Sequence, residues 1–263
     1  LAKTLSSTLQ RRNLSKIAVL SPLGSDSAII NAMQADSSSK VQVIKKASYN
    51  HNEFHSLDQA IQNLLGIDYT ERAEEYRELV ETKKKEAIES GTVFKKDQVF
   101  LDPKFDFGSI YIADDFRVAR HVAKILKFYG LDKLPLVGNS SWRDFSLVQP
   151  YDSFFDNSFF VDYVGMYDKL PFSVHSQGNL NTLISASQSE NTDYKLMGYR
   201  AATIVASAFS KRFSTKAKLA KILRTQTLPK DVFFRFTKAF DKNNRSIWPA
   251  FVFNISKETI TIE

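Results

Sequence analysis

The chain has 263 residues and contains no cysteine. That absence excludes disulfide scaffolds, thiolate metal sites and cysteine nucleophiles. No run of apolar residues approaches the roughly 20 that a membrane-spanning helix needs. The sequence also lacks the short motifs of P-loop nucleotide-binding proteins, zinc peptidases, EF-hands and serine hydrolases. These absences predict a protein with no catalytic activity, no metal and no cofactor.

The residues that are present predict an ordinary globular protein. Hydrophobic residues make up 43% of the chain and charged residues 25%, a normal balance for a folded domain. The content of 21 Phe and 10 Tyr excludes disorder of the chain as a whole. The length suits one large domain or two compact lobes.

The net charge of +7 is concentrated near the C-terminus. Residues 211–245 contain 11 Lys and Arg but only two acids, Asp231 and Asp241, so this segment carries +9 and the rest of the chain −2. A solvated helix face with flanking loops explains such a run most simply, and binding to an anionic polymer or a membrane surface is the alternative. Nucleic-acid binding is not expected, because no aromatic RNA platform or reader helix accompanies the charge.

Short apolar strands alternate with amphipathic helices along most of the chain. The expected strands are 17–20, 41–47, 107–113, 134–137 and 158–164, and the expected helices include 1–12, 27–35, 54–65, 194–210 and 215–225. The inward residues are expected to be Ala28, Ile29 and Met33 in helix 27–35, and Met197, Ala201, Ile204, Val205 and Ala208 in helix 194–210. Parallel strands need crossover connections of this kind, so the alternation predicts an α/β fold with a parallel sheet flanked by helices. Alternation with period two over 247–253 and 258–262 predicts a closing β-hairpin.

Residues 68–97 interrupt the pattern, since sixteen of these thirty residues are charged. A thin apolar stripe through Tyr76 and Val80 predicts one long exposed helix, roughly 70–90, that ends at Ser90-Gly91. We expect a surface insertion here rather than a core element.

Three polar loops follow expected strands, at 21–26, 114–115 and 139–142. Loops at the carboxyl ends of parallel strands share one edge of the sheet, where ligands bind in such folds. The first loop offers hydroxyls and backbone N–H groups, the second carboxylates for an amine or a sugar, and the third an aromatic stacking surface. The candidate ligand-binding residues are Ser21, Ser25, Asp114, Asp115, Asn139, Ser140 and Trp142. Each loop by itself is also explained by helix caps and turns.

Two other constellations are weaker candidates. His51 and His55 have i,i+4 spacing, but a solvated turn and helix start explains them better than a metal site. Asp152 and Asp156 lie in an aromatic segment that is more simply interpreted as core packing than as an acid–base pair.

A family resemblance rests on KIAVLSP (16–22), FDFGSIYIADDFRVARHVAKILKFYG (105–130) and LPLVGNSSW (134–142). In this order they resemble type I periplasmic binding proteins of the leucine/isoleucine/valine class, and more distantly the binding-protein-like domain of penicillin-binding-protein activator lipoproteins. The family's aromatic residue in the first loop is not matched, because Leu23-Gly24-Ser25 stands there. Specificity for amino acids is therefore not implied.

The resemblance implies two lobes, in which the chain starts in lobe one, crosses to lobe two and returns. Residues 1–160 would form lobe two, with the charged helical insert 68–97. Residues 161–263 would form the returning segment of lobe one with its C-terminal hairpin. The N-terminal part of lobe one is expected to be absent from this sequence.

The function implied is that of a non-catalytic solute-binding protein of the periplasm or cell envelope, closing on a small polar ligand such as an amino acid or peptide fragment. An ABC transporter would be its partner, and contact with a membrane would come through a lipid anchor upstream. The alternative is a ligand-free interaction module that regulates a cell-envelope enzyme such as a peptidoglycan synthase.

Overall fold

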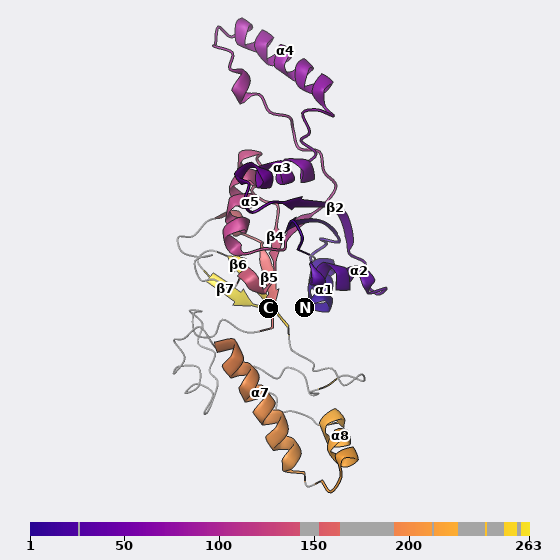
Figure 1. The fold of residues 1–263 in the computed structure, drawn as a ribbon. Helices are drawn as coiled ribbons and strands as arrows, with labels where there is room; N and C mark the ends of the chain where they lie inside the picture. Colours follow the sequence, from indigo (N-terminus) through magenta and orange to yellow (C-terminus); the bar gives the residue numbers. More distant parts are fainter. Residues whose placement is uncertain are drawn as a thin grey trace. The chain divides into compact units, whose positions relative to one another are not determined.

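The computed structural model describes residues 1–25, 27–142, 153–163, 192–211, 213–225, 240, 250–256 and 259–263 (Figure 1). The chain forms two compact units. The first unit comprises Leu1–Phe160 with Asn254–Thr261, and the second comprises Val161–Phe253 with Ile262–Glu263.

The described strands form one sheet in the order β2-β1-β3-β4-β5-β6-β7. They are β1 (Lys16–Pro22), β2 (Gln42–Tyr49), β3 (Ser109–Ile112), β4 (Leu136–Gly138), β5 (Phe159–Asp162), β6 (Phe251–Ser256) and β7 (Thr259–Ile262). The pairs β1–β2, β1–β3, β3–β4 and β4–β5 are all parallel. The predicted α/β fold with a mostly parallel sheet flanked by helices is therefore confirmed.

Four helices of the first unit connect these strands or precede them. They are α1 (Ala2–Arg11), α2 (Ala28–Ala35), α3 (Phe54–Leu64) and α5 (Phe116–Phe128). The crossover through α2 runs from β1 to β2, and the one through α3 runs back past β1 to β3. Because parallel crossovers are right-handed, these opposite directions place α2 and α3 on opposite faces of the sheet (Figure 1). Helix α1 packs with α2, and α5 packs with α3.

The core of the first unit lies between these layers. Residues 17–20 of β1 and all four residues of β3 are buried, as expected for central strands covered on both faces. Helix α5 buries Phe116, Ala119, Val122, Ala123 and Leu126 against the sheet. In α2 the buried positions are Ile30 and Met33, whereas Ala28, expected inside, is exposed.

Helix α4 (Ala73–Glu89) is the predicted charged helix, and it ends at Ser90 with Gly91 at φ +67°. Two long segments connect it to the α/β layers (Figure 1). Within this fully described helix Ala87 alone is buried. The insert is held at its base by Arg72, whose guanidinium binds Glu75 and the carbonyl oxygens of Gly66 and Asp102.

The described helices of the second unit are α7 (Thr192–Phe209) and α8 (Lys216–Thr225), which pack against each other. The expected inward face of α7 is confirmed for Ile204 and Ala208, but Ala201 and Val205 are exposed. Strands β6 and β7 are neighbours separated by two residues, so they form an antiparallel hairpin, as predicted. The start of the predicted hairpin, 247–249, lies outside the described residues. Among the described helices, none has the length and hydropathy of a membrane span.

Candidate functional site

The carboxyl ends of β2, β1, β3 and β4 lie along one edge of the sheet. The registers show this directly, since Pro22 pairs with Tyr49, Leu20 with Ile112, and Tyr111 with Val137. The loops that begin at Ser21, at Asp114 and at Asn139 therefore leave the sheet on the same side. Asp26, expected in the first loop, lies outside the described residues.

The direction in which successive strands are added to the sheet reverses between β1 and β3. From β1 the chain goes first to β2 on one side and then to β3 on the other. In open parallel sheets such a reversal separates two loops and leaves a crevice between them at the carboxyl ends of the strands, where ligands bind. Here the two loops are those after β1 and β3, the first two predicted polar loops.

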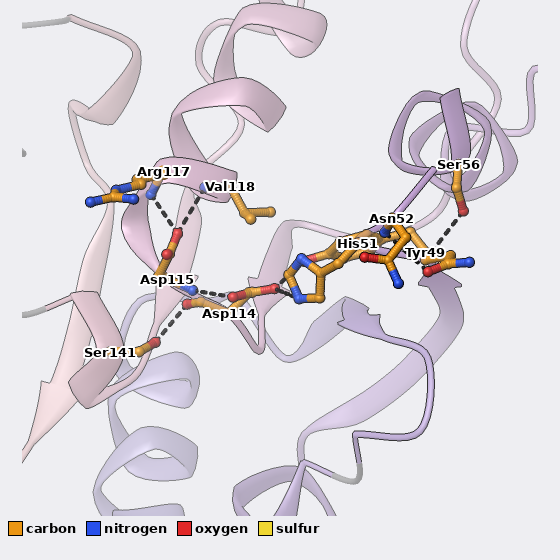
Figure 2. A network of polar contacts seen from close by, with 10 residues as sticks. Tyr49, His51, Asn52, Ser56, Asp114, Asp115, Arg117, Val118 and Ser141 are labelled. Atoms are coloured by element: carbon orange, nitrogen blue, oxygen red, sulfur yellow. Dashed lines mark hydrogen bonds and ion pairs between the residues drawn. The ribbon is translucent and has the colours of Figure 1, made fainter. Parts of the chain in front are cut away.

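Asp114 is the centre of the polar network at this edge (Figure 2). Its Oδ1 accepts the backbone N–H of Asp115 at 2.6 Å. Its Oδ2 accepts the hydroxyl of Tyr49 and lies 3.0 Å from Nε2 of His51. The hydroxyl of Ser141 donates to its backbone carbonyl at 2.6 Å. Asp114 thus connects the ends of β2, β3 and β4, and its side chain is only 14% exposed.

Tyr49 is a hydrogen-bond donor locked in its neutral form. Burial raises its pKa above the usual value, and the hydrogen bond to Asp114 and the charges of Asp114 and Asp115 raise it further. A neutral phenol beside a carboxylate keeps its proton for that carboxylate. The imidazole of His51 lies edge-on to the Tyr49 ring at 5.2 Å, so the two side chains support each other.

Asp115 caps helix α5, as predicted. Its Oδ1 accepts the backbone N–H groups of Arg117 at 2.8 Å and Val118 at 3.2 Å (Figure 2). These are two of the four N–H groups that the first turn of a helix leaves without a partner. The two neighbouring carboxylates therefore have different roles. Asp115 caps helix α5, and Asp114 bonds to residues at the ends of the neighbouring strands.

The loop after β4 is ordered by Asn139. Its Oδ1 accepts the backbone N–H of Ser141 at 2.8 Å, and its Nδ2 donates to the hydroxyl of Tyr111 at 3.2 Å. The Tyr111 hydroxyl is also hydrogen-bonded to Ser27, the N-cap of α2. Tyr111 thereby joins the first and third loops, while Ser140 is half-buried and Ser141 exposed.

The first loop is the most open of the three. Ser21 lies in β1, with its Oγ 3.4 Å from that of Ser48. The turn is closed by backbone bonds from Leu23 to Tyr49 and from Ser25 to Pro22. Gly24 at φ +76° makes this turn possible, and Ser25 is exposed. Leu23, where the family's aromatic residue was not matched, has an exposed fraction of 64%.

The prediction of a stacking surface at Trp142 is wrong, because its indole is fully buried at 0% exposure. The ring lies against Gly138, where a Cβ would approach Cδ2 of Trp142 to 2.1 Å, and edge-on to Phe155. Within the described residues its Nε1 has no hydrogen-bond partner. Trp142 supports the third loop from inside and offers no ring face at the edge.

Sequence reasoning missed the contribution of the end of β2. Tyr49 and His51 follow a strand that was expected to end at residue 47, and His51 was interpreted as part of a solvated turn. The rule about carboxyl ends of parallel strands applies to this strand as well, so it could have identified them. Among the described residues, no group of three His, Cys, Asp or Glu could hold a metal ion. Asp152, of the weaker carboxylate pair, lies outside these residues.

Sequence comparison finds no protein-family model that matches the chain and no curated relative at a significant level. Comparison of structures does find similar proteins. One is a branched-chain amino acid transporter substrate-binding protein, LivJ, from Streptococcus pneumoniae in complex with isoleucine, with 14% identity and a TM-score of 0.53. Another is an ABC transporter substrate-binding protein from Desulfitobacterium hafniense in complex with Leu, with 13% identity and a TM-score of 0.51.

A third similar structure, from Rhodospirillum rubrum, is described as a branched-chain amino acid ABC transporter, with 12% identity and a TM-score of 0.60. Each match covers 100% of this chain. The chain spans 63–64% of the length of these three proteins. At this level of identity the likeness concerns the fold alone.

Proposed function

From its type I periplasmic-binding-protein-like fold, we propose that this chain is a non-catalytic solute-binding protein of the cell envelope. Its ligand is a small polar molecule such as an amino acid or a peptide fragment. The observation that carries the proposal is the gathering of polar side chains from three parallel strand ends, those of β2, β3 and β4, around Asp114, next to the point where the strand order reverses. Substrate-binding proteins with this fold, LivJ among them, support the same class of function.

We call the polar loops after β1, β3 and β4, together with the end of β2, the rim. In this proposal Asp114 and Asp115 fix the structure of the rim and do not bind the ligand by themselves. Both carboxylate oxygens of Asp114, and Oδ1 of Asp115, already accept hydrogen bonds from the protein. The groups that a ligand would meet first are the hydroxyls of Ser21 and Ser141 and the His51 imidazole, together with Ser25, Asn139 and Ser140. Leu23, exposed beside them, would contact an apolar part of the ligand.

We further propose that residues 1–160 form one lobe and residues 161–263 part of the other. Closure of the two lobes would exchange the water on the rim for hydrogen bonds to the ligand, as in other hinged binding proteins. An ABC transporter would then receive the ligand from the closed form.

A thermal-shift screen tests the proposal. The melting temperature of the chain is measured with a panel of amino acids, amides and cell-wall peptide fragments. A ligand that binds only the folded state stabilises it by RT ln(1 + L/Kd), where L is the free ligand concentration, so the melting temperature rises with the logarithm of that concentration above Kd. Absence of a shift across the panel at millimolar concentrations would count against a solute-binding role.

Variants then locate the binding. Ser21→Ala combined with Asn139→Ala is expected to reduce the ligand-induced shift several-fold. The matched control is Ser7→Ala on α1, which is exposed and bonds only the carbonyl of Thr4. Equal ligand shifts in both variants would place binding elsewhere.

A second candidate function is an interaction module that regulates a cell-envelope enzyme. The exposed charged surface of α4 favours it, because this helix adds almost nothing to the core. The test is binding of the chain to a purified peptidoglycan synthase, with and without residues 68–97. Binding that survives the deletion unchanged would remove the support for this function.

A further inference from the structure

Helices α7 and α8 meet at a corner (Figure 1, orange). This corner exposes apolar side chains. Val205 and Phe209, four residues apart on one face of α7, have exposed fractions of 49% and 62%. Ala202 lies on the same face and is also exposed. Beyond the end of α7, Phe213 meets Phe209 edge-on at 5.1 Å. Exposed apolar residues that form a contiguous patch, rather than lying scattered, mark surfaces that bind proteins or membranes.

Helix α8, next to this apolar face, carries charge of one sign only. Lys216, Lys218 and Lys221 are exposed, whereas Leu219, Ala220, Ile222 and Leu223 are partly covered. Thr215 accepts the backbone N–H of Lys218 and so fixes the start of the helix. The helix is therefore amphipathic, and its solvent face is basic.

The charge extends beyond α8. Residues 194–230 contain nine Lys and Arg and no Asp or Glu. No ion pair can form between two residues of this segment, because all its charges are positive. The charged helix α4 is different, because it carries six glutamates along with its three lysines and one arginine, and Lys83 is paired with Glu86 at 2.8 Å. Mixed signs of charge are usual on a solvated helix face, whereas a single positive sign next to exposed apolar side chains is typical of helices that lie on anionic membranes.

We propose that the α7–α8 corner docks on the surface of a bilayer that contains anionic lipids. Val205 and Phe209 enter the headgroup boundary, and the lysines of α8 lie among the lipid phosphates. Lipid fits better than nucleic acid, because the exposed aliphatic side chains of Val205 and Ala202 beside the Phe209 ring suit an acyl boundary, whereas a base would stack on aromatic rings alone. The proposal is independent of the solute-binding function, since it concerns different residues and a different kind of partner.

Cosedimentation with lipid vesicles tests the proposal. One set of vesicles contains phosphatidylcholine alone, and the other contains phosphatidylcholine with 30% phosphatidylglycerol. The chain is expected to bind the anionic vesicles at least tenfold more strongly, and 0.5 M salt is expected to weaken that binding strongly because it screens surface charge. Equal binding to the two sets, or no binding to either, would overturn the proposal.

Two charge-reversal variants locate the surface. The combination K216E, K218E and K221E is expected to reduce partition onto anionic vesicles by about 100-fold or more, since each basic residue near such a surface contributes a factor of about five. The control K83E, K84E and K85E makes the same change of charge on α4 and is expected to retain most of the binding. An equal loss in both variants would mean that net charge, not this corner, attracts the chain.

A third variant tests the apolar part of the surface. Val205→Ser with Phe209→Ser leaves every charge in place, and its folding is checked by circular dichroism. Partition is expected to fall about tenfold or more, because two apolar side chains no longer leave water. If this variant binds vesicles as the wild type does, or if the wild type binds duplex DNA more tightly than anionic vesicles, the assignment to lipid is wrong.

Discussion

Asp114 accepts hydrogen bonds from two residues on the end of β2 and one at the start of α5, so its charge organises the rim. Replacement of Asp114 by Asn keeps the shape of the side chain but removes its charge. The amide NH2 of Asn is itself a donor, so it cannot accept the hydrogen bonds that one carboxylate oxygen accepts. Hydrogen bonds to a charged partner contribute about 1.5–3 kcal/mol each, so Asp114→Asn is expected to lower the free energy of unfolding by about 1–3 kcal/mol. Chemical denaturation measures this loss. Asp106→Asn, an exposed carboxylate paired with Lys16, is the control and should cost less than about 1 kcal/mol.

The same hydrogen bond makes a prediction about the titration of Tyr49. Its pKa is raised in the folded chain, so this residue stabilises the fold below the ordinary tyrosine pKa and loses that contribution as the pH rises further. The difference in tyrosinate absorbance between wild type and Tyr49→Phe isolates this residue from the other tyrosines. Asp114→Asn should move the pKa of Tyr49 back toward 10. Titration of Tyr49 near 10 in the wild type would contradict the network.

Gly138 allows the Trp142 ring to lie against the backbone of β4. A Cβ there would come within 2.1–2.6 Å of three atoms of the indole, which is fully buried and cannot move aside. Gly138→Ala is therefore expected to destabilise the chain by about 1–3 kcal/mol or more. In Gly198→Ala on α7 the new Cβ meets no atom within 4 Å, so a gain of about 0.5–1 kcal/mol is expected. Thermal denaturation compares the two variants, and a neutral Gly138→Ala would show that the ring is not held there.

Some site residues were predictable because their role is local. Asp115 precedes an amphipathic helix and caps it, which the sequence pattern shows directly. The burial of Trp142 was not predictable, because it depends on a glycine on the preceding strand and on Phe155 from a different segment. The role of Tyr49 depends on a carboxylate 65 positions away. Only the packing of the strands brings these two together.

At the scale of elements, the base of α4 is held by charge. Hydrogen bonds from Arg72 and then from Lys104 lower the pKa of Glu75 to about 2. A lowered carboxyl pKa stabilises the folded form above the unfolded value of about 4.5, and this contribution is lost as the pH falls toward 2. The protection factors of the α4 amides against hydrogen exchange, corrected for the intrinsic rate at each pH, should therefore fall below pH 4.5, before those of the sheet do.

Two variants distinguish the effect of the Arg72–Glu75 contact, which we call the clamp, from the effect of surface charge in general. Arg72→Gln removes the bidentate partner and should raise the pKa of Glu75, as measured from its side-chain carbon resonance in an NMR titration. Arg77→Gln removes a guanidinium 3.7 Å from Glu74 on the exposed surface, and it should leave Glu75 unchanged. A pKa of Glu75 near 4.5 in the wild type would exclude the clamp.

Most elements were predictable within a few residues, because hydrophobic periodicity and turn residues define them locally. The exact buried face was less predictable. In α2 the inward residues are Ile30 and Met33, whereas the pattern favoured Ala28, Ile29 and Met33. In α7 the apolar residues continue around the helix, so periodicity could not distinguish the buried Ile204 from the exposed Val205.

At the scale of the whole molecule, strand alternation was sufficient to predict a parallel sheet, and with it one edge that carries all the strand ends. Neither the order of the seven strands nor the outermost position of β2 follows from local patterns. Strand order is decided by which crossovers pack best, a property of the complete layers. The motifs that resemble binding proteins added the expectation that this edge binds a solute.

The most direct test of that expectation is a map of amide chemical shifts in the labelled chain during titration with the amino acids and peptide fragments of the panel. We predict saturable shifts at Ser21–Ser25, His51, Asp114, Asn139 and Ser141, with the helices α1 and α4 unaffected. NMR detects millimolar affinities, so it also reports weak binding. If no member of the panel produced saturable shifts, or if they clustered away from this edge, the solute-binding account would be wrong.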